Sequence, residues 1–315
     1  MENQILAIRN PESIAVPQRI NELSETFISA QDVKENSKMT YRKALKQFMQ
    51  WIAENNEQHP NRDAILRYKK YLESKELSAC TCNCYLTVVR KFFKWANATI
   101  GYPIISDVKG CRKPKGFRKD PLTKDQVHQL LAGIDRSTIE GKRNASMLTL
   151  MIATGLRTVE LTRANIADIH QESGTPILSI QGKGRDTKDE IVLLTTGTLQ
   201  TIQDYLKERG VVADNEPLFI SHSNKNDGAR LSTRTISRVA KEGLRAIGLN
   251  NSRYTAHSLR HSAATLAYLG GADLQSMKQM MRHSSCDTTQ IYIHAVDRIK
   301  NAAEFKIDSY LNGGL

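Results

Sequence analysis

A-H-S-L-R-H at 256–261 and M-R-H-S-S-C-D-T-T-Q-I-Y-I-H at 281–294 carry the strongest signal in this chain for both fold and chemistry. One arginine and one lysine further upstream complete the set. Two arginines can hold a phosphate, a tyrosine can attack it, and lysine and histidine can move the protons. These residues predict that a phosphodiester is broken and rejoined without metal, through a covalent protein–DNA intermediate. The six candidate catalytic residues are Arg157, Lys183, His257, Arg260, His283 and Tyr292.

The two candidate phosphate clamps each have a local reason to face a phosphate. Arg157 follows a helix expected to end at Gly155, so it should lie at the next helix N-terminus, where free N–H groups favour an anion. Glu160, three residues on, can pair with Arg157 and fix its orientation, although a surface Arg–Glu pair fits the same spacing. His257 and Arg260 share a face at the start of an expected helix over 258–269, where His257 could instead cap the helix.

A hairpin is expected across 176–194, from P-I-L-S-I-Q to E-I-V-L-L, with Lys183 in its connection. A lysine in this G-K-G turn can protonate the 5′ oxygen as it leaves, which is general acid catalysis. A solvated turn lysine is the alternative, and Lys188 is a rival in the same loop.

His283 and Tyr292 complete the set. His283 follows a short helix that begins near Asp273, and its ring nitrogen suits a phosphate oxygen. Asp287 is expected to cap a short helix that presents the Tyr292 phenol. A free phenol has a pKa of about 10 and is a poor nucleophile, but two arginines lower the cost of the phenolate. A core tyrosine is the alternative for Tyr292, and His261 is given no catalytic role.

Together these motifs resemble the tyrosine recombinases of the phage-integrase family, most of all the compact Xer-type and transposon members. The matching segments are A-T-G-L-R-T-V-E-L at 153–161, G-K-G at 182–184, H-S-L-R-H-S-A-A-T at 257–265, G-A-D-L at 271–274, and H-S-S followed by T-T-Q-I-Y. The resemblance favours Lys183 over Lys188. His257 is expected to donate to a phosphate oxygen and to exchange a proton with Tyr292. Arg282 departs from it, because the family usually has glycine there. It alters the turn or adds a phosphate contact.

The resemblance implies a mainly α fold with a small β-hairpin or sheet, in two domains that clamp a duplex. We expect a helical core-binding, SAM-like domain over 1–106, with helices near 17–30, 38–54, 62–74 and 78–97 from the apolar spacing. Glycines and prolines place a basic linker at 107–121, where residues 111–121 hold five Lys or Arg against one Asp. T-K-D-Q at 123–126 is a capping box that opens the catalytic domain, 122–315.

Composition supports a nucleic-acid partner. The formal net charge is +12 and the pI about 9.4, an excess that favours nucleic acid or an anionic membrane surface. No 18-residue apolar run or signal peptide is apparent, and five cysteines fit a reducing cytoplasm. C-T-C-N-C at 80–84 lacks a second ligand pair at zinc spacing, and Cys82 lies on an apolar stripe. No cofactor or metal is expected, since neither a P-loop nor paired acids appear.

The predicted function is site-specific recombination of double-stranded DNA through a 3′-phosphotyrosine, for integration, excision or resolution. The resemblance implies a homotetramer on two sites, with no membrane partner and an accessory DNA-bending or directionality protein as a further candidate. A tail helix after Tyr292, with Val296, Ile299, Ala303 and Ile307 near one face, would pack into a neighbouring subunit. The alternatives are a type IB topoisomerase, which usually has lysine in place of His257, and a non-cleaving DNA-end-binding protein of a mobile element.

Overall fold

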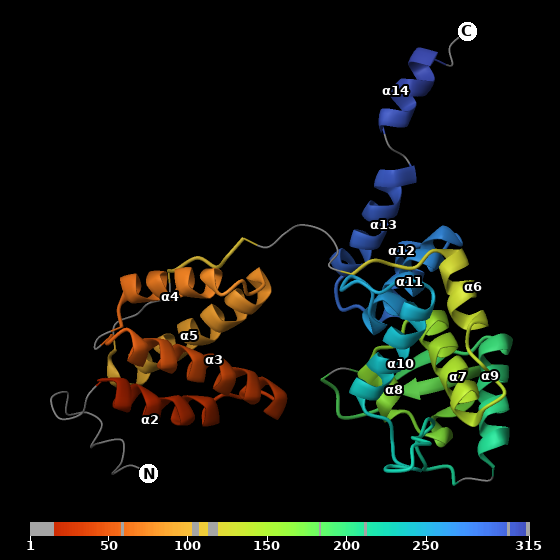
Figure 1. Ribbon diagram of the computed structural model, residues 1–315, viewed down its shortest axis with the longest axis horizontal. Helices are drawn as coiled ribbons and strands as arrows, with labels where there is room; N and C mark the ends of the chain where they lie inside the picture. The colour runs from red at the N-terminus through yellow and green to blue at the C-terminus, as the bar shows by residue number, and fades with distance from the viewer. Residues whose placement is uncertain are drawn as a thin grey trace. The chain divides into compact units, whose positions relative to one another are not determined.

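The computed structural model describes residues 16–57, 60–102, 107–112, 119–182, 184–210, 213–300 and 303–312. The chain divides into two compact units, Met1–Lys115 and Gly116–Leu315. Each unit has its own hydrophobic core. Figure 1 shows the helices of the first unit in red to orange and the elements of the second in yellow to blue.

The first unit is helical in its described part. Its helices are α2 (Val16–Ser29), α3 (Glu35–Glu54), α4 (Arg62–Ser74) and α5 (Ala79–Ile100). In each helix apolar residues recur every three or four positions, so one face of the helix is buried. The Asn61 and Ser78 side chains cap α4 and α5 by accepting the backbone N–H of Ala64 and Thr81. The helix positions expected from the apolar spacing are confirmed to within a few residues.

Aromatic side chains dominate the core of this unit. Phe48 packs edge-on against both Tyr68 and Phe93, with ring centroids 4.9 and 5.9 Å apart. Cys82 is 1% exposed among these apolar side chains, which confirms the prediction that it belongs to the helix core. Buried area of this kind is the main stabilising contribution to a small helical domain.

The predicted linker, 107–121, is anchored at both ends. Near its start Val108 is buried against α5, and the Val108 carbonyl accepts a hydrogen bond from the Arg90 guanidinium at 2.9 Å. Near its end Asp120 pairs with Arg253 in the second unit. The Leu122 N–H donates to the Ser262 hydroxyl at 2.7 Å. The segment therefore begins on one unit and ends on the other.

The second unit is mainly helical and contains one small sheet, which confirms the predicted fold class. Its elements are α6 (Lys124–Ala132), α7 (Ile139–Thr154), α8 (Thr158–Arg163), the 3-10 turn η1 (Ile166–Asp168), β1 (Ile169–Glu172), β2 (Thr175–Ile180), β3 (Glu190–Leu193), α9 (Thr196–Arg209), α10 (Thr233–Ala246), α11 (Ala256–Leu269), α12 (Leu274–Met281), α13 (Cys286–Lys300) and α14 (Ala303–Asn312). Thr123 and Gln126 form the expected capping box at the start of α6.

The sheet is antiparallel with the order β1-β2-β3. The predicted hairpin is present, with Leu178 opposite Val192. On the other side of β2, Leu178 lies opposite Ile169 of β1, a strand that the sequence did not predict. Its residues, I-H-Q-E, are mostly polar and three of the four are exposed, so no apolar alternation marks them.

The C-terminal helices differ from the prediction. Because α13 begins at Cys286, Asp287 lies inside its first turn and does not occupy the expected cap position. Tyr292 lies near the middle of this helix, and the tail contains a separate helix, α14, whose side chains are all exposed. In the described part of the chain, no helix has the length and apolarity needed to cross a bilayer.

Candidate active site

Five of the six predicted site residues line one open pocket of about 590 Å³ in the second unit. Arg157 lies at the start of α8, whereas α11 contributes both His257 and Arg260. His283 lies between α12 and α13, and Tyr292 on α13. Lys183, the sixth, lies outside the described residues. The pocket thus collects residues from positions more than 130 apart in the chain, because α11 packs against α7, α12 and α13.

Arg157 is the N-cap residue of α8 and is held by Glu160. Glu160 is fully buried and accepts the Arg157 backbone N–H at 2.8 Å and its Nη1 at 2.5 Å. The predicted pair is therefore present, but the carboxylate is inside the protein and not on a surface. Burial alone would raise the pKa of Glu160, but Arg282 and Arg157 outweigh it and hold the pKa below its ordinary value.

Arg260 is almost completely buried, and its fork is aimed by two carbonyl groups. Its Nη1 donates to the Gly155 carbonyl and its Nη2 to the Met281 carbonyl. Gly155 ends α7 with φ at 63°, and a Cβ there would lie 2.8 Å from the Met281 sulfur, so glycine suits both its backbone and its packing. Burial, and then the charges of Arg157 and Arg282, lower the pKa of Arg260 to about 9.

His283 is oriented by Thr289, a residue that sequence reasoning missed. Its Nδ1 lies 2.9 Å from the Thr289 hydroxyl, which is fully buried on α13. Burial and the nearby arginines, Arg260 first among them, lower the pKa of His283 to about 4. The ring is therefore neutral at pH 7. A signal for Thr289 was available, because it lies three residues before Tyr292 and so on the same face of a helix.

Tyr292 is buried among histidines, with 4% of its surface exposed. Its ring centroid lies 5.2 Å from that of His261 and 6.3 Å from that of His283. Burial raises the pKa of Tyr292, although Arg260 and Arg157 oppose the shift. The phenol is therefore protonated in the DNA-free protein. Burial and the neighbouring His257 likewise lower the pKa of His261 to about 4.

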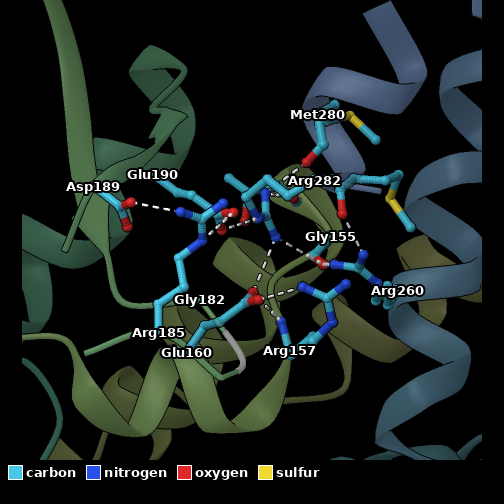
Figure 2. Close-up of polar contacts among 12 residues, drawn as sticks. Gly155, Arg157, Glu160, Gly182, Arg185, Asp189, Glu190, Arg260, Met280 and Arg282 are labelled. Atoms are coloured by element: carbon cyan, nitrogen blue, oxygen red, sulfur yellow. Dashed lines mark hydrogen bonds and ion pairs between the residues drawn. The ribbon is translucent and has the colours of Figure 1, made fainter. Parts of the chain in front are cut away.

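Arg282, the departure from the family pattern, lies beside both clamps. It adopts the left-handed conformation, with φ at 52°, which is the conformation that makes glycine common at the end of a helix. Its side chain is 5% exposed and donates to Glu160 at 3.0 Å. Figure 2 shows Glu160 between Arg157 and Arg282. The Arg282 guanidinium thus donates to acceptors within the protein.

Of the two lysines in the β2–β3 connection, Lys188 lies within the described residues and Lys183 does not. Lys188 forms an ion pair with Asp168, the last residue of η1. The connection begins at Gly182, whose carbonyl accepts a hydrogen bond from Arg163 at 3.3 Å. In the described residues, no group of three His, Cys, Asp or Glu side chains is placed to hold a metal ion.

A second, larger groove of about 1020 Å³ shares Arg157, His257 and Arg260 with the pocket. Its other wall is α10, which contributes the exposed side chains of Arg234 and Arg238. The groove therefore continues the positive charge of the pocket across the face of the unit. Positive side chains that line a groove are typical of surfaces that hold a polyanion.

Sequence comparison matches two families in order along the chain. The phage integrase family matches residues 120–298, and the phage integrase N-terminal SAM-like domain matches residues 20–99. Tyrosine recombinase XerC of Chlamydia trachomatis serovar L2 is 36% identical over 196 residues, which are 61% of this chain and 59% of that relative. Tyrosine recombinase XerA of Pyrococcus furiosus is 29% identical over 287 residues, 90% of this chain and 93% of that relative.

Solved structures share the fold. The XerH site-specific recombinase bound to palindromic difH substrate superposes with a TM-score of 0.71 at 20% identity, over 96% of this chain and 90% of that one. The Tn1549 transposon integrase in complex with transposon right end DNA gives a TM-score of 0.69 at 16% identity, over 92% and 100% of the two chains. Likeness at this level of identity establishes the fold alone.

Proposed function

The chain belongs to the phage integrase family, and from this premise we propose that it is a tyrosine site-specific recombinase, which cleaves and rejoins DNA through a 3′-phosphotyrosine. One observation carries the proposal. The buried phenol of Tyr292 shares a pocket with two arginines, Arg157 and Arg260, whose orientations are fixed by protein acceptors. Preorganised donors of this kind stabilise the charge that develops on a phosphate in the transition state.

In the first step the Tyr292 oxygen bonds to a DNA phosphorus, and the bond from phosphorus to the 5′ oxygen breaks. The phenol proton passes to a base in the pocket, for which His257 is our candidate. The leaving 5′ oxygen takes a proton from Lys183. A 5′ hydroxyl from another strand then attacks the phosphotyrosine, reseals the backbone and returns the phenol. The phosphodiester bond energy is kept throughout, so no nucleotide is consumed.

His283 is assigned as a hydrogen-bond donor to a nonbridging phosphate oxygen. Its lowered pKa keeps the ring neutral at pH 7, so one nitrogen carries a proton and the other accepts. We assign Nδ1 as the acceptor from the Thr289 hydroxyl. That assignment leaves the ring proton on Nε2.

The partner we propose is duplex DNA. The groove beside the pocket, with Arg234 and Arg238 on α10, offers charge to the phosphates that flank the scissile one. The XerH and Tn1549 structures hold difH and transposon-end DNA, respectively, which supports a duplex with defined sites as the substrate here. Integration, excision and resolution are all reactions that such a site serves.

We further propose that the protein assembles as a homotetramer on two sites in the reducing cytoplasm, with an accessory DNA-bending or directionality protein as a candidate partner. The support for assembly is α14, on which Ile307, Tyr310 and Leu311 are exposed at spacings of three and four. Exposure of an apolar stripe to water is unfavourable, and burial against a neighbouring subunit would remove it from water. All five cysteines are free, in keeping with a reducing compartment.

The experiment selects bound duplexes from a random library and then supplies two copies of the selected site on separate plasmids. A recombinase joins the plasmids at the site and nowhere else. Relaxation of supercoiled plasmids that lack the site, without joining, would favour the topoisomerase alternative. Tight binding without any strand cleavage would favour the DNA-end-binding alternative.

A further inference from the structure

The Arg282 guanidinium donates hydrogen bonds to acceptors that also hold the two phosphate clamps, Arg157 and Arg260. Its Nη2 donates to Glu160 at 3.0 Å and to the Gly155 carbonyl at 3.3 Å. Glu160 is the carboxylate that holds Arg157, and the Gly155 carbonyl is one of the two that aim Arg260. One side chain therefore shares an acceptor with each clamp (Figure 2).

The same guanidinium faces the connection between β2 and β3. Arg282 Nε lies 4.0 Å from Glu190 Oε2, at the start of β3. That oxygen packs against Gly182, where a Cβ would approach it to 2.7 Å. Glu190 therefore contacts the β2–β3 connection where it leaves β2. Arg185 approaches Glu190 from the other side at 3.4 Å.

Direct contact between Arg282 and the DNA phosphate is disfavoured by its surroundings. The side chain is 5% exposed, and its Nη1 donates to the carbonyls of Met280 and Thr154 at 2.5 and 3.3 Å. Arg157, in contrast, is 28% exposed, and in the described residues only Glu160 accepts from its side chain. Both Nη atoms of the buried Arg282 are therefore occupied by protein acceptors, whereas the partly exposed Arg157 has donors to offer.

We propose that Arg282 is a positioning residue, which rests on the proposed function: it holds Glu160, the Gly155 carbonyl and Glu190 so that both clamps, Arg157 and Arg260, meet the same phosphate. Its backbone is left-handed, with φ at 52°, and this conformation is strained for any residue with a Cβ. The side-chain contacts offset that strain. Arg282→Gly is therefore an informative substitution, since it relaxes the backbone and deletes only the contacts.

The first measurement separates cleavage from binding in Arg282→Gly. We expect the rate of covalent-complex formation on saturating nicked substrate to fall by about 10- to 100-fold, because a small misplacement of a clamp has that effect. The Kd for the site should stay nearly unchanged. Ser173→Gly is the matched control, because Ser173 has a similar φ of 49° in the β1–β2 turn, away from the pocket. It should cleave like the wild type.

The pH profile of cleavage gives a readout that mere loss of stability would not move. The groups that face Glu160 are Arg157 and Arg282, with Arg260 nearby and Glu190 acting on Arg282. Arg282 is the strongest influence that lowers the pKa of Glu160. Without it the pKa rises, so the acid limb of the profile should move to higher pH in Arg282→Gly. An unmoved limb would overturn the proposal, as would a loss of binding as large as the loss of rate.

A thermal unfolding cycle without DNA tests the contact itself. Arg282→Gly and Glu160→Gln should each lower Tm, and the double variant should lose less than the sum of the two, because both single changes remove the same buried ion pair. Additive losses would show that no such contact exists. If the wild type formed no covalent complex, the proposed function would fail and the positioning role with it. The cycle would still report whether Arg282 and Glu160 are coupled.

Discussion

The Thr289 hydroxyl lies 2.9 Å from Nδ1 of His283, and Thr289 itself is three residues before Tyr292 on α13. Because Thr289 is fully buried, the ring has few other orientations available. The contact links the orientation of a phosphate donor to the helix that presents the nucleophile. It also selects the ring nitrogen that faces the pocket.

Replacing Thr289 with valine keeps the shape and removes the hydroxyl. We expect cleavage of a nicked site to slow by about five- to tenfold, which corresponds to one hydrogen bond of about 1 kcal/mol. Thr289→Ser retains the hydroxyl and should restore most of the rate. The orientation role would be wrong if the valine variant cleaved as fast as the serine variant.

Lys183→Ala should slow cleavage far more than binding, because it removes the proton donor for the leaving 5′ oxygen. A substrate with sulfur in place of that oxygen has a better leaving group and should restore much of the rate. Lys188→Ala is the control, since Lys188 is already paired with Asp168. If sulfur rescued Lys188→Ala and had no effect on Lys183→Ala, the general acid would be Lys188.

The low pKa values of His261 and His283 predict acid sensitivity. Both lie at about 4 in the folded protein, against about 6.5 in an unfolded chain. Between these values the unfolded state binds more protons, so stability is lost as pH falls from about 6.5 to about 4. Each histidine adds a slope of up to about 1.4 kcal/mol per pH unit.

Urea unfolding at several pH values measures this slope. His261→Gln removes one of the two groups and should flatten the slope within that window while leaving the pH dependence above pH 7 as it is in the wild type. Equal slopes in the wild type and the variant would show that His261 titrates normally in the folded protein.

The exposed stripe of α14 should matter for assembly and not for binding a single site. Ile307→Asp places a charge on the stripe, whereas Ser309→Asp places the same charge on the other face of the helix. We expect Ile307→Asp to bind one site normally but to pair two sites poorly in a gel-shift assay. The proposed docking would be wrong if both variants paired sites as well as the wild type. A truncation that tests the same role should begin at residue 303, so that it removes α14 and leaves α13 intact. Asp297 of α13 accepts a hydrogen bond from Tyr268 at 2.7 Å, and a longer truncation would remove this contact as well.

Sequence reasoning reached most of this architecture because its signals were local. The apolar spacing predicted both ends of α4 and the end of α3, whose start lies three residues before the predicted one, and Ser78 marked the start of α5. Strand β1 was missed because its polar residues are stabilised by pairing with β2, which is a tertiary effect. Asp287 was misassigned as a cap because the helix begins two residues earlier than a cap at that position implies.

The site shows the same division between local and tertiary signals. The pairing of Arg157 with Glu160 follows from a spacing of three on one helix and could be predicted. The contacts of Arg282 with Glu160 and Glu190 cross more than 90 residues of sequence, so no local pattern contains them. The sequence showed only that Arg282 stands where the family usually has glycine. The fold shows which neighbours its side chain contacts.

The covalent intermediate tests the central claim most directly. On a nicked suicide substrate that carries the selected site, the wild type should accumulate a protein–DNA adduct that survives a denaturing gel and is destroyed by protease. Tyr292→Phe lacks only the attacking oxygen, so it should bind the site with similar affinity and form no adduct. Digestion of the wild-type adduct should leave a Tyr292 peptide on the 3′ phosphate. An adduct of undiminished yield in Tyr292→Phe, or one attached through another residue, would contradict the assignment of Tyr292 as the nucleophile.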